Sequence, residues 1–303
     1  KGRPAVAVES RDLRGTFLPK DGGKLASLIT SAGRELLVQN PNPVYAVLTP
    51  TGSYADAECS GFDDMFPTID PYTPQKGLYA GVTYPDHGEA CRYPMKMKFT
   101  SDAVILHGKS RLFAVTYDKV ITSEEDGSIV VCYTFTNHSS EPFLYLWAAH
   151  CLLAGAPDGI VTSPYAKDAP AQMMFGPPNA EQYSRIQLEN PSVSLPAYKY
   201  YYLEPASEGW CGYYYPSFHE EFRLSYDPTK VPYLGVWLNN RGFNGLYCVA
   251  LEPCTSPFDR PDIAEQKGCA STLPPNGSFS FSLKLSLNKL SSFFPVSKSL
   301  QRE

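Results

Sequence analysis

The sequence predicts an all-β protein built as a large sandwich of antiparallel sheets. Three observations indicate this class: apolar side chains recur with a period of two, proline and aromatic residues are abundant, and helical signals are few. The 303 residues include 28 Pro, 21 Tyr and 16 Phe. Proline disrupts helices because it lacks a backbone N–H, whereas aromatic residues favour strands. Since no repeat or linker divides the chain, we expect a single domain over residues 1–303, with a peripheral tail from about residue 291.

The predicted strands follow one another along the chain, with turn residues between them. Apolar residues alternate with serine and lysine over 278–287, and with lysine and threonine over 95–100, so each segment is expected to bury one face. Further strand-like segments cover 112–121, 129–136, 198–203, 233–238 and 246–251. Asp126-Gly127 stands between two of these segments, and such a pair is typical of a tight hairpin turn.

The clearest helical signal covers residues 259–268. Asp259 is a suitable amino-terminal cap, Pro261 falls in the first turn, and Gly268 is a natural stop. We therefore expect one short helix near the end of the predicted domain, and strands in most of the remaining chain.

Charge and motif content argue against several classes of protein. The net charge is −5 and the pI is near 5.6, whereas nucleic-acid binders carry basic surfaces. The longest apolar stretch, residues 143–156, is too short to span a bilayer, so we expect no membrane span. The chain has no P-loop, no G-x-G-x-x-G after a strand and no G-x-S-x-G elbow, so we expect neither a nucleotide-dependent enzyme nor a serine hydrolase, and no spacing fits a metal site.

The eight cysteines are predicted to be reduced. No C-x-x-C pair occurs, and most of the cysteines lie inside apolar, strand-like segments, where small buried side chains are expected. Disulfides are rare in reducing compartments. We therefore expect a cytoplasmic protein, or an organellar one whose targeting segment has been removed.

Two ionisable residues stand in strongly apolar segments. His150 follows Leu146-Trp-Ala-Ala149, and Glu252 ends an apolar run just before Pro253. A core histidine bonded to a backbone carbonyl, and a salt-bridged carboxylate, are the simplest interpretations. Because burying an ionisable group is unfavourable unless the group is paired or used, the functional interpretation is an acid and a base at a cleft.

Two polar loops and one tryptophan supply further candidates. Residues 85–92 place a histidine, a glutamate and an arginine beside Gly88, and residues 60–67 place two aspartates among aromatic side chains. Each loop alone is typical of a solvated turn, and most aromatic residues are expected to be packing residues. The candidate binding residues are His87, Arg92, Asp63, Asp64, Glu89 and Trp210.

Taken in this order, the motifs resemble those of the aldose 1-epimerase (galactose mutarotase-like) superfamily, in particular its divergent, less characterised branch. The resemblance extends from about residue 20 to residue 288. It implies a β-supersandwich with a sugar-binding cleft and no cofactor. The matching segments are Gly61-Phe-Asp-Asp-Met-Phe-Pro-Thr68, Asp86-His-Gly-Glu89, Leu146-Trp-Ala-Ala-His150 and Ala250-Leu-Glu-Pro-Cys-Thr255.

The resemblance also implies a reaction, the interconversion of the α and β anomers of a hexose or of a modified or phosphorylated hexose. Glu252 is then the base that removes the anomeric hydroxyl proton, and His150 is the acid that protonates the ring oxygen. His87 is expected to hydrogen-bond the sugar. A nearby Glu252 carboxylate is expected to favour protonated His150. No counterpart of the family's middle sugar-binding aspartate is evident.

Two other functions are compatible with the sequence. The first is a non-catalytic carbohydrate-binding or structural module of a larger assembly, whose protein partners the sequence does not identify. The second, ranked last, is a glycosidase with paired carboxylates roughly 5–9.5 Å apart. We expect His150 and Glu252 to face each other across a cleft in an enzyme, and a plugged or covered cleft in a structural module.

Overall fold

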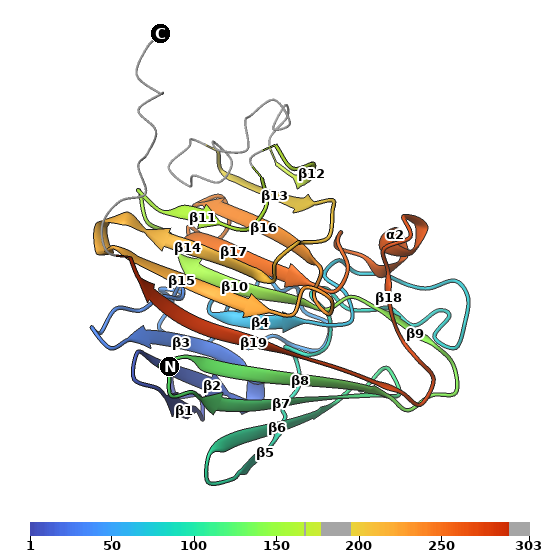
Figure 1. The fold of residues 1–303 in the computed structure, drawn as a ribbon. Coiled ribbons are helices and arrows are strands. Elements are labelled where there is room, and N and C mark those ends of the chain that lie inside the picture. The colour runs from blue at the N-terminus through green and yellow to red at the C-terminus, as the bar shows by residue number, and fades with distance from the viewer. Residues whose placement is uncertain (167, 177–194, 291–303) are drawn as a thin grey trace.

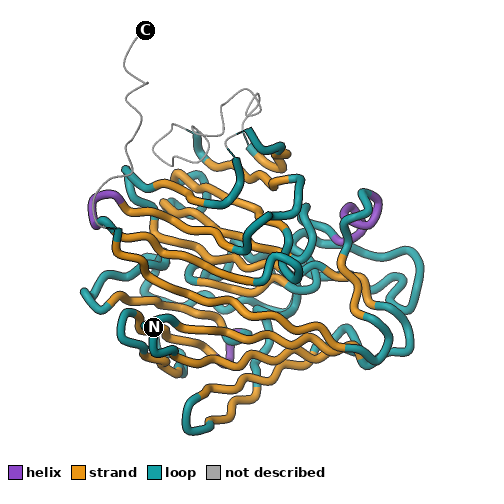
Figure 2. Tube along the Cα trace, viewed as in Figure 1, coloured by secondary structure: helices purple, strands orange, loops and turns teal. Residues whose placement is uncertain are grey.

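Two large antiparallel sheets, packed face to face, form most of the molecule. The computed structural model describes residues 1–166, 168–176 and 195–290, and within these residues every pair of strands is antiparallel (Figures 1 and 2). The all-β class and the antiparallel sandwich predicted from the sequence are therefore confirmed. The predicted tail from about residue 291 lies outside the described residues.

The two large sheets comprise nine and eight strands of the described chain, with a small two-stranded sheet at one end. In spatial order the nine-stranded sheet contains β1 (Val6–Glu9), β2 (Leu13–Leu18), β3 (Lys24–Thr30), β4 (Phe62–Met65), β10 (Ala148–Ala154), β17 (Tyr247–Cys254), β16 (Tyr233–Asn240), β13 (Ala197–Tyr202) and β12 (Ala171–Phe175). The eight-stranded sheet contains β11 (Ile160–Thr162), β14 (Trp210–Tyr215), β15 (Glu220–Tyr226), β19 (Ser278–Lys289), β8 (Ile129–Asn137), β7 (Val115–Ser123), β6 (Ala103–Lys109) and β5 (Lys96–Phe99). The small sheet pairs β18 (Ser271–Leu273) with β9 (Phe143–Tyr145), and the described helical segments are η1 (Pro19–Asp21), η3 (Pro216–Phe218) and α2 (Pro261–Gln266).

The main core lies between the two large sheets and is rich in aromatic rings. Phe66 packs against Phe135 at 4.6 Å between ring centroids, and Trp147 packs against Phe281 at 4.5 Å. Successive side chains of a strand point to opposite faces, so each strand supplies this core with every second residue. The alternation predicted over 278–287 is of this kind, since Leu283 and its alternate neighbours are buried there.

A buried ion pair joins the two large sheets. Lys119 of β7 lies 2.5 Å from Asp64 of β4, and both side chains are about 95% buried (4% and 5% exposed). The ammonium also donates to the carbonyls of Gly22 and Gly23, and the indole N–H of Trp147 donates to the same carboxylate. A buried charge is tolerated only when it is paired and hydrogen-bonded, and both conditions are met here.

Several local predictions are confirmed, and one is wrong. The hairpin at Asp126-Gly127 joins β7 to β8. The segment 95–100 contains the strand β5, but its predicted buried face is not formed, because Met97 and Phe99 are 41% and 63% exposed. The reason is position: β5 is the edge strand of its sheet, so one of its sides lacks a neighbouring strand.

The predicted helix exists but is shorter, and its cap is different. The helix α2 begins at Pro261 and ends at Gln266, with Arg260 at the capping position and no side-chain cap. Gly268, with a φ of 73°, follows the helix as predicted. Asp259 does not cap the helix, because its carboxylate is bonded to Lys199.

All eight cysteines are free, and six of them are buried. Cys132 is exposed and Cys269 is intermediate. The prediction that most of the cysteines are buried is confirmed. Among the residues that the structure describes, no helix has the length and apolar character needed to cross a membrane.

The Lys119–Asp64 pair gives a stability prediction. Asp64→Ala leaves the Lys119 ammonium buried without its counter-ion, so we expect a loss of roughly 3–5 kcal/mol in the free energy of unfolding, measured by urea denaturation. The double variant Asp64→Leu/Lys119→Met removes both charges and is expected to be clearly more stable than Asp64→Ala. A change below about 0.5 kcal/mol in Asp64→Ala would contradict this role for the pair.

Candidate functional site

A cavity of about 390 Å³ lies on the outer face of the nine-stranded sheet. Cys151 and Leu251 belong to the core between the sheets, and side chains alternate along a strand, so His150 and Glu252 point to the opposite face. The same alternation carries Lys199 to that face, because Tyr198 and Tyr200 are core residues. The cavity is lined by Ser53, Tyr54, Ala55, Cys59, Ile69, Asp70, Asp86, His87, His150, Met174, Phe175, Lys199, Trp237, Phe243, Asn244, Glu252 and Asp259.

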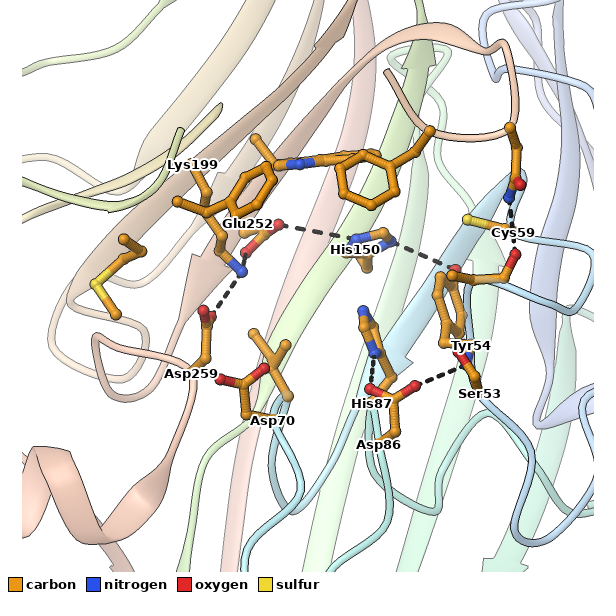
Figure 3. Close-up of a pocket in the computed structure, with 17 residues that line it drawn as sticks. Ser53, Tyr54, Cys59, Asp70, Asp86, His87, His150, Lys199, Glu252 and Asp259 are labelled. Atoms are coloured by element: carbon orange, nitrogen blue, oxygen red, sulfur yellow. Dashed lines mark hydrogen bonds and ion pairs between the residues drawn. The ribbon is translucent and has the colours of Figure 1, made fainter. Parts of the chain in front are cut away.

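The strand register brings the polar groups of the cavity together. Strands β10 and β17 are neighbours with Cys151 opposite Leu251, which places His150 and Glu252 side by side one residue further on. Figure 3 shows both side chains pointing into the same space. Two small apolar clusters flank them on this face, one containing Tyr201 and the other Leu152. His150 and Glu252 are therefore the polar residues between two apolar clusters on this face of the sheet.

Backbone strain is concentrated around the cavity. Of the seven non-glycine residues with left-handed φ angles in the described chain, three line the cavity and a fourth precedes Asp259. Such conformations are unfavourable and are often found at functional sites. The four residues are Cys59 (41°), His87 (57°), Asn244 (50°) and Phe258 (69°). Next to His87, Gly88 passes so close to Phe66 that a Cβ atom would lie 2.2 Å from the Phe66 carbonyl oxygen.

One buried lysine joins two carboxylates at the centre of the site. The Nζ atom of Lys199 lies 2.7 Å from Glu252 Oε2 and 2.7 Å from Asp259 Oδ1. The hydroxyl of Tyr201 also donates to Asp259 Oδ1 at 2.8 Å. Burial acts to lower the pKa of Lys199, but the charges of Asp259 and Glu252 outweigh it and raise the pKa above its ordinary value. The two carboxylates therefore favour the charged form of the ammonium.

Glu252 keeps one oxygen available. Its side chain is buried, and Oε1 accepts no hydrogen bond from the described residues. Burial raises the pKa of Glu252 above its ordinary value, and the charge of Lys199 opposes that rise. A buried carboxylate oxygen that faces a cavity and has no donor is suited to accept a proton from a ligand.

His150 is held between Glu252 and Tyr54. Its Nε2 lies 3.9 Å from Glu252 Oε1, and its Nδ1 lies 3.4 Å from the Tyr54 hydroxyl. Burial, followed by the positive charges of His87, Lys199 and Lys24, lowers the pKa of His150 well below its ordinary value. The protonated ring expected beside Glu252 is therefore disfavoured in the free cavity, chiefly because burial penalises the charged imidazole and because the nearby positive charges add to that effect.

His87 forms the opposite side of the cavity. Its Nδ1 lies 2.7 Å from Asp86 Oδ1, and its ring stacks on Tyr54 with 4.2 Å between centroids. Burial acts to raise the pKa of Asp86, but the hydrogen bond and charge of His87 outweigh it and lower the pKa. The ring is thus fixed in position with its other nitrogen available for a ligand.

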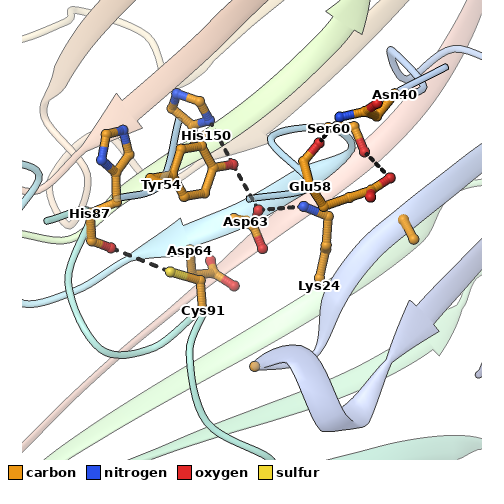
Figure 4. Close-up of polar contacts among 12 residues, drawn as sticks. Lys24, Asn40, Tyr54, Glu58, Ser60, Asp63, Asp64, His87, Cys91 and His150 are labelled. Atoms are coloured by element: carbon orange, nitrogen blue, oxygen red, sulfur yellow. Dashed lines mark hydrogen bonds and ion pairs between the residues drawn. The ribbon is translucent and has the colours of Figure 1, made fainter. Parts of the chain in front are cut away.

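Three of the eight predicted site residues, His150, Glu252 and His87, line the cavity. Asp63 lies one layer below, where it pairs with Lys24 at 2.6 Å and accepts the Tyr54 hydroxyl at 2.8 Å (Figure 4). Asp63 therefore supports Tyr54, which in turn contacts both His87 and His150.

The other four predicted binding residues do not line the cavity. Asp64 points into the core between the sheets. Arg92 is buried and donates to the carbonyls of Gly88 and Thr49 among others, which ties two loops together. Glu89 is buried below the loop, where its carboxylate accepts the Ser110 hydroxyl and the Arg111 backbone N–H. Trp210 lies in β14 of the other large sheet, and the guanidinium of Arg223 stacks on it at 4.1 Å.

Sequence reasoning missed Lys199, Asp259 and Asp70 as cavity residues. A signal existed for Lys199: it is the one charged residue in the apolar strand Ala197–Tyr202, the same property that distinguishes His150. Asp259 was assigned to a helix cap, and Asp70 lies in a loop without any pattern. Within the described ranges, no group of three His, Cys, Asp or Glu side chains is placed to hold a metal ion.

Comparison with known proteins identifies the fold. No family model and no curated protein matches the chain. Among solved structures, the Slr1438 protein of Synechocystis superposes with a TM-score of 0.70 at 15% identity, covering 95% of this chain and 97% of that one. A candidate aldose 1-epimerase of Klebsiella pneumoniae gives 0.69 at 16%, with 91% and 76% covered, and a galactose mutarotase-like protein of Lactobacillus casei gives 0.65 at 17%, with 94% and 100% covered. The chain therefore has the galactose mutarotase-like fold.

The contacts of His150 give a titration prediction. We expect its imidazole, followed by NMR, to titrate below the ordinary value of 6.5, and Lys199→Met to raise this pKa because one facing positive charge is removed. Lys98→Met removes a lysine from the exposed strand β5 and is the matched control, expected to leave His150 unchanged. A wild-type pKa at or above 6.5, or no response to Lys199→Met, would contradict the described electrostatics.

Proposed function

We propose that this chain is a sugar mutarotase of the aldose 1-epimerase type, which interconverts the α and β anomers of a hexose. One observation carries the proposal: His150 and Glu252 lie on neighbouring strands, with 3.9 Å between Nε2 and Oε1, inside a single cavity of about 390 Å³. Ligand cavities start at about 300 Å³, so this one is large enough for one hexose ring. The fold shared with a candidate aldose 1-epimerase adds support.

The reaction needs one acid and one base, and the atoms balance without a cofactor. Glu252 Oε1 accepts the proton of the anomeric hydroxyl, the C1–O1 bond becomes a carbonyl, and the C1–ring oxygen bond breaks. The ring oxygen receives a proton from His150 Nε2. Rotation about C1–C2 and closure on the other face of the carbonyl then reverse these proton transfers and give the second anomer.

The reaction also fixes how many protons the pair must hold. If both groups have lost their protons, no acid is available, and if both are protonated, no base is available. The active form therefore carries one proton, shared by His150 and Glu252, and titrates as a coupled pair. Lys199 opposes the rise that burial causes in the pKa of Glu252, which suits the base role, while the burial of His150 makes its proton easy to release.

Other lining residues are suited to hold the sugar. His87 is fixed by Asp86 and Tyr54 and offers its second nitrogen to a hydroxyl group. Trp237 and Phe243 form an aromatic wall, with 5.8 Å between their centroids, against which the apolar face of a sugar ring can pack.

The alternatives identified from the sequence are less well supported. A structural module has no use for a buried carboxylate oxygen without a donor, such as Glu252 Oε1. A glycosidase needs one carboxyl group that protonates the leaving group. The closely spaced carboxylates here, Glu252 and Asp259, are both bound to the Lys199 ammonium, which favours their ionised forms.

Removing either member of the pair is expected to abolish catalysis. Glu252→Gln and His150→Ala should each lower the rate of anomer interconversion roughly 10²–10⁴-fold, because each removes one proton transfer. NMR exchange spectroscopy on glucose and galactose, with protein against buffer, measures the rate. Circular dichroism of each variant verifies that it is folded, and a folded variant with near-wild-type turnover would remove its residue from the mechanism.

The pH profile follows from the two pKa shifts. The rate should rise with pH through the raised pKa of Glu252, because the base must be ionised, and fall through the lowered pKa of His150, because the acid must be protonated. We therefore expect a bell-shaped profile, measured by the same exchange experiment from pH 4 to 8. A rate that is constant up to pH 8 would contradict this assignment.

A further inference from the structure

The cavity contains more negative charge than the proposed reaction requires. Four carboxylates line it, whereas the only lysine or arginine among the described lining residues is Lys199. That ammonium is already bound to Glu252 and Asp259, so it has little capacity to bind an anionic substituent of a substrate. The four carboxylates are Asp70, Asp86, Glu252 and Asp259.

Two of these carboxylates have no function in the proton transfers. Asp86 orients His87, and Glu252 is the base, which leaves Asp70 and Asp259. Their backbones are joined, because the N–H of Asp70 donates to the carbonyl of Asp259 at 2.8 Å. Figure 3 shows the two side chains next to each other on one side of the cavity.

Asp70 lies at the exposed rim of the cavity, where no hydrogen bond or ion pair joins its carboxylate to a described residue. Burial and the charge of Asp259 raise its pKa, so a cation from outside would stabilise it. The guanidinium of Arg260 is bonded instead to Asp262. In the same cavity, the buried Glu252 Oε1 lacks a donor, which independently indicates that a ligand completes this site.

We infer that the hexose bound here carries an ammonium group, held between Asp70 and Asp259, as in a 2-amino-2-deoxyhexose. This rests on the proposed function, since Glu252 defines the anomeric end of the sugar. Lys199 connects Glu252 directly to Asp259, so Asp259 and the neighbouring Asp70 lie beside the substituents next to the anomeric carbon. A phosphorylated hexose is disfavoured, because its charge would face these carboxylates without a free cation.

The test compares sugars that differ in charge at one position. Anomer exchange is measured by NMR for D-glucosamine, N-acetyl-D-glucosamine, D-glucose and glucose 6-phosphate at one acidic pH. We expect kcat/KM to be highest for glucosamine, about tenfold above its neutral N-acetyl analogue, and lowest for glucose 6-phosphate. Equal values for glucosamine and its N-acetyl analogue, or the highest value for glucose 6-phosphate, would overturn the inference.

A variant separates this inference from the proposed function. Asp70→Asn should reduce the ratio of glucosamine to glucose turnover about tenfold, because one carboxylate partner of the ammonium is lost. Asp102→Asn, which removes an equal charge from an exposed turn, is the matched control and should leave the ratio unchanged. A ratio unaffected by Asp70→Asn would contradict the assignment of the ammonium site.

Equilibrium binding keeps the two proposals distinguishable. If no sugar shows accelerated exchange, the proposed function fails, and calorimetry with glucosamine and glucose still measures the preference of the cavity. Tighter binding of glucosamine, weakened by Asp70→Asn, would then support an ammonium site in a non-catalytic module. Equal or absent binding of both sugars would overturn the inference as well.

Discussion

The ion pairs of Lys199 are the interaction on which the site depends. Glu252 lies in the middle of a sheet with no exposed surface, and an isolated carboxylate there would take up a proton rather than remain charged. Lys199, two strands away, supplies the compensating charge and at the same time fixes Asp259. The carboxylate can therefore be both buried and ionised, which is the combination that a general base in an apolar cavity requires. The cavity surrounds this lysine, and His150, Asp70 and Asp259 line the same cavity.

Three carboxylate–lysine groups have their carboxylates buried at the nine-stranded sheet, and comparing them distinguishes structure from function. The pairs Lys119–Asp64 and Lys24–Asp63 are closed, since their remaining contacts are carbonyls, a tyrosine hydroxyl and an indole. Such fully satisfied groups specify how sheets and loops pack. The group around Lys199 is open, because one oxygen of Glu252 and the carboxylate of Asp70 have no partner among the described residues. We therefore expect ligand binding and proton transfer at the group around Lys199, and a structural role for the two closed pairs.

Alternation explains both what could be predicted from the sequence and what could not. The all-β class follows from local periodicity, and His150 and Glu252 are conspicuous because each interrupts an apolar strand. Asp63 and Asp64 are adjacent in sequence but point to opposite faces of β4, so a motif containing both could not show which one approaches the cavity. Arg92 and Glu89 have the residue types of a binding loop, yet their partners are backbone groups brought near only by folding. Asp70 became a candidate only once its neighbour Asp259 was known.

The positive charge of Lys199 has opposite consequences for the proposed base and the proposed acid. Lys199 favours the ionised form of Glu252, and the same positive charge disfavours the proton on His150. A charge that keeps Glu252 ionised therefore also lowers the fraction of His150 that is protonated, so the two groups cannot be tuned independently. The surplus carboxylates of the cavity act in the opposite direction, because they lower the potential at the ring without touching it. An ammonium substituent bound by those carboxylates would cancel part of that benefit, so the bound sugar itself becomes one of the charges that set the protonation of the pair.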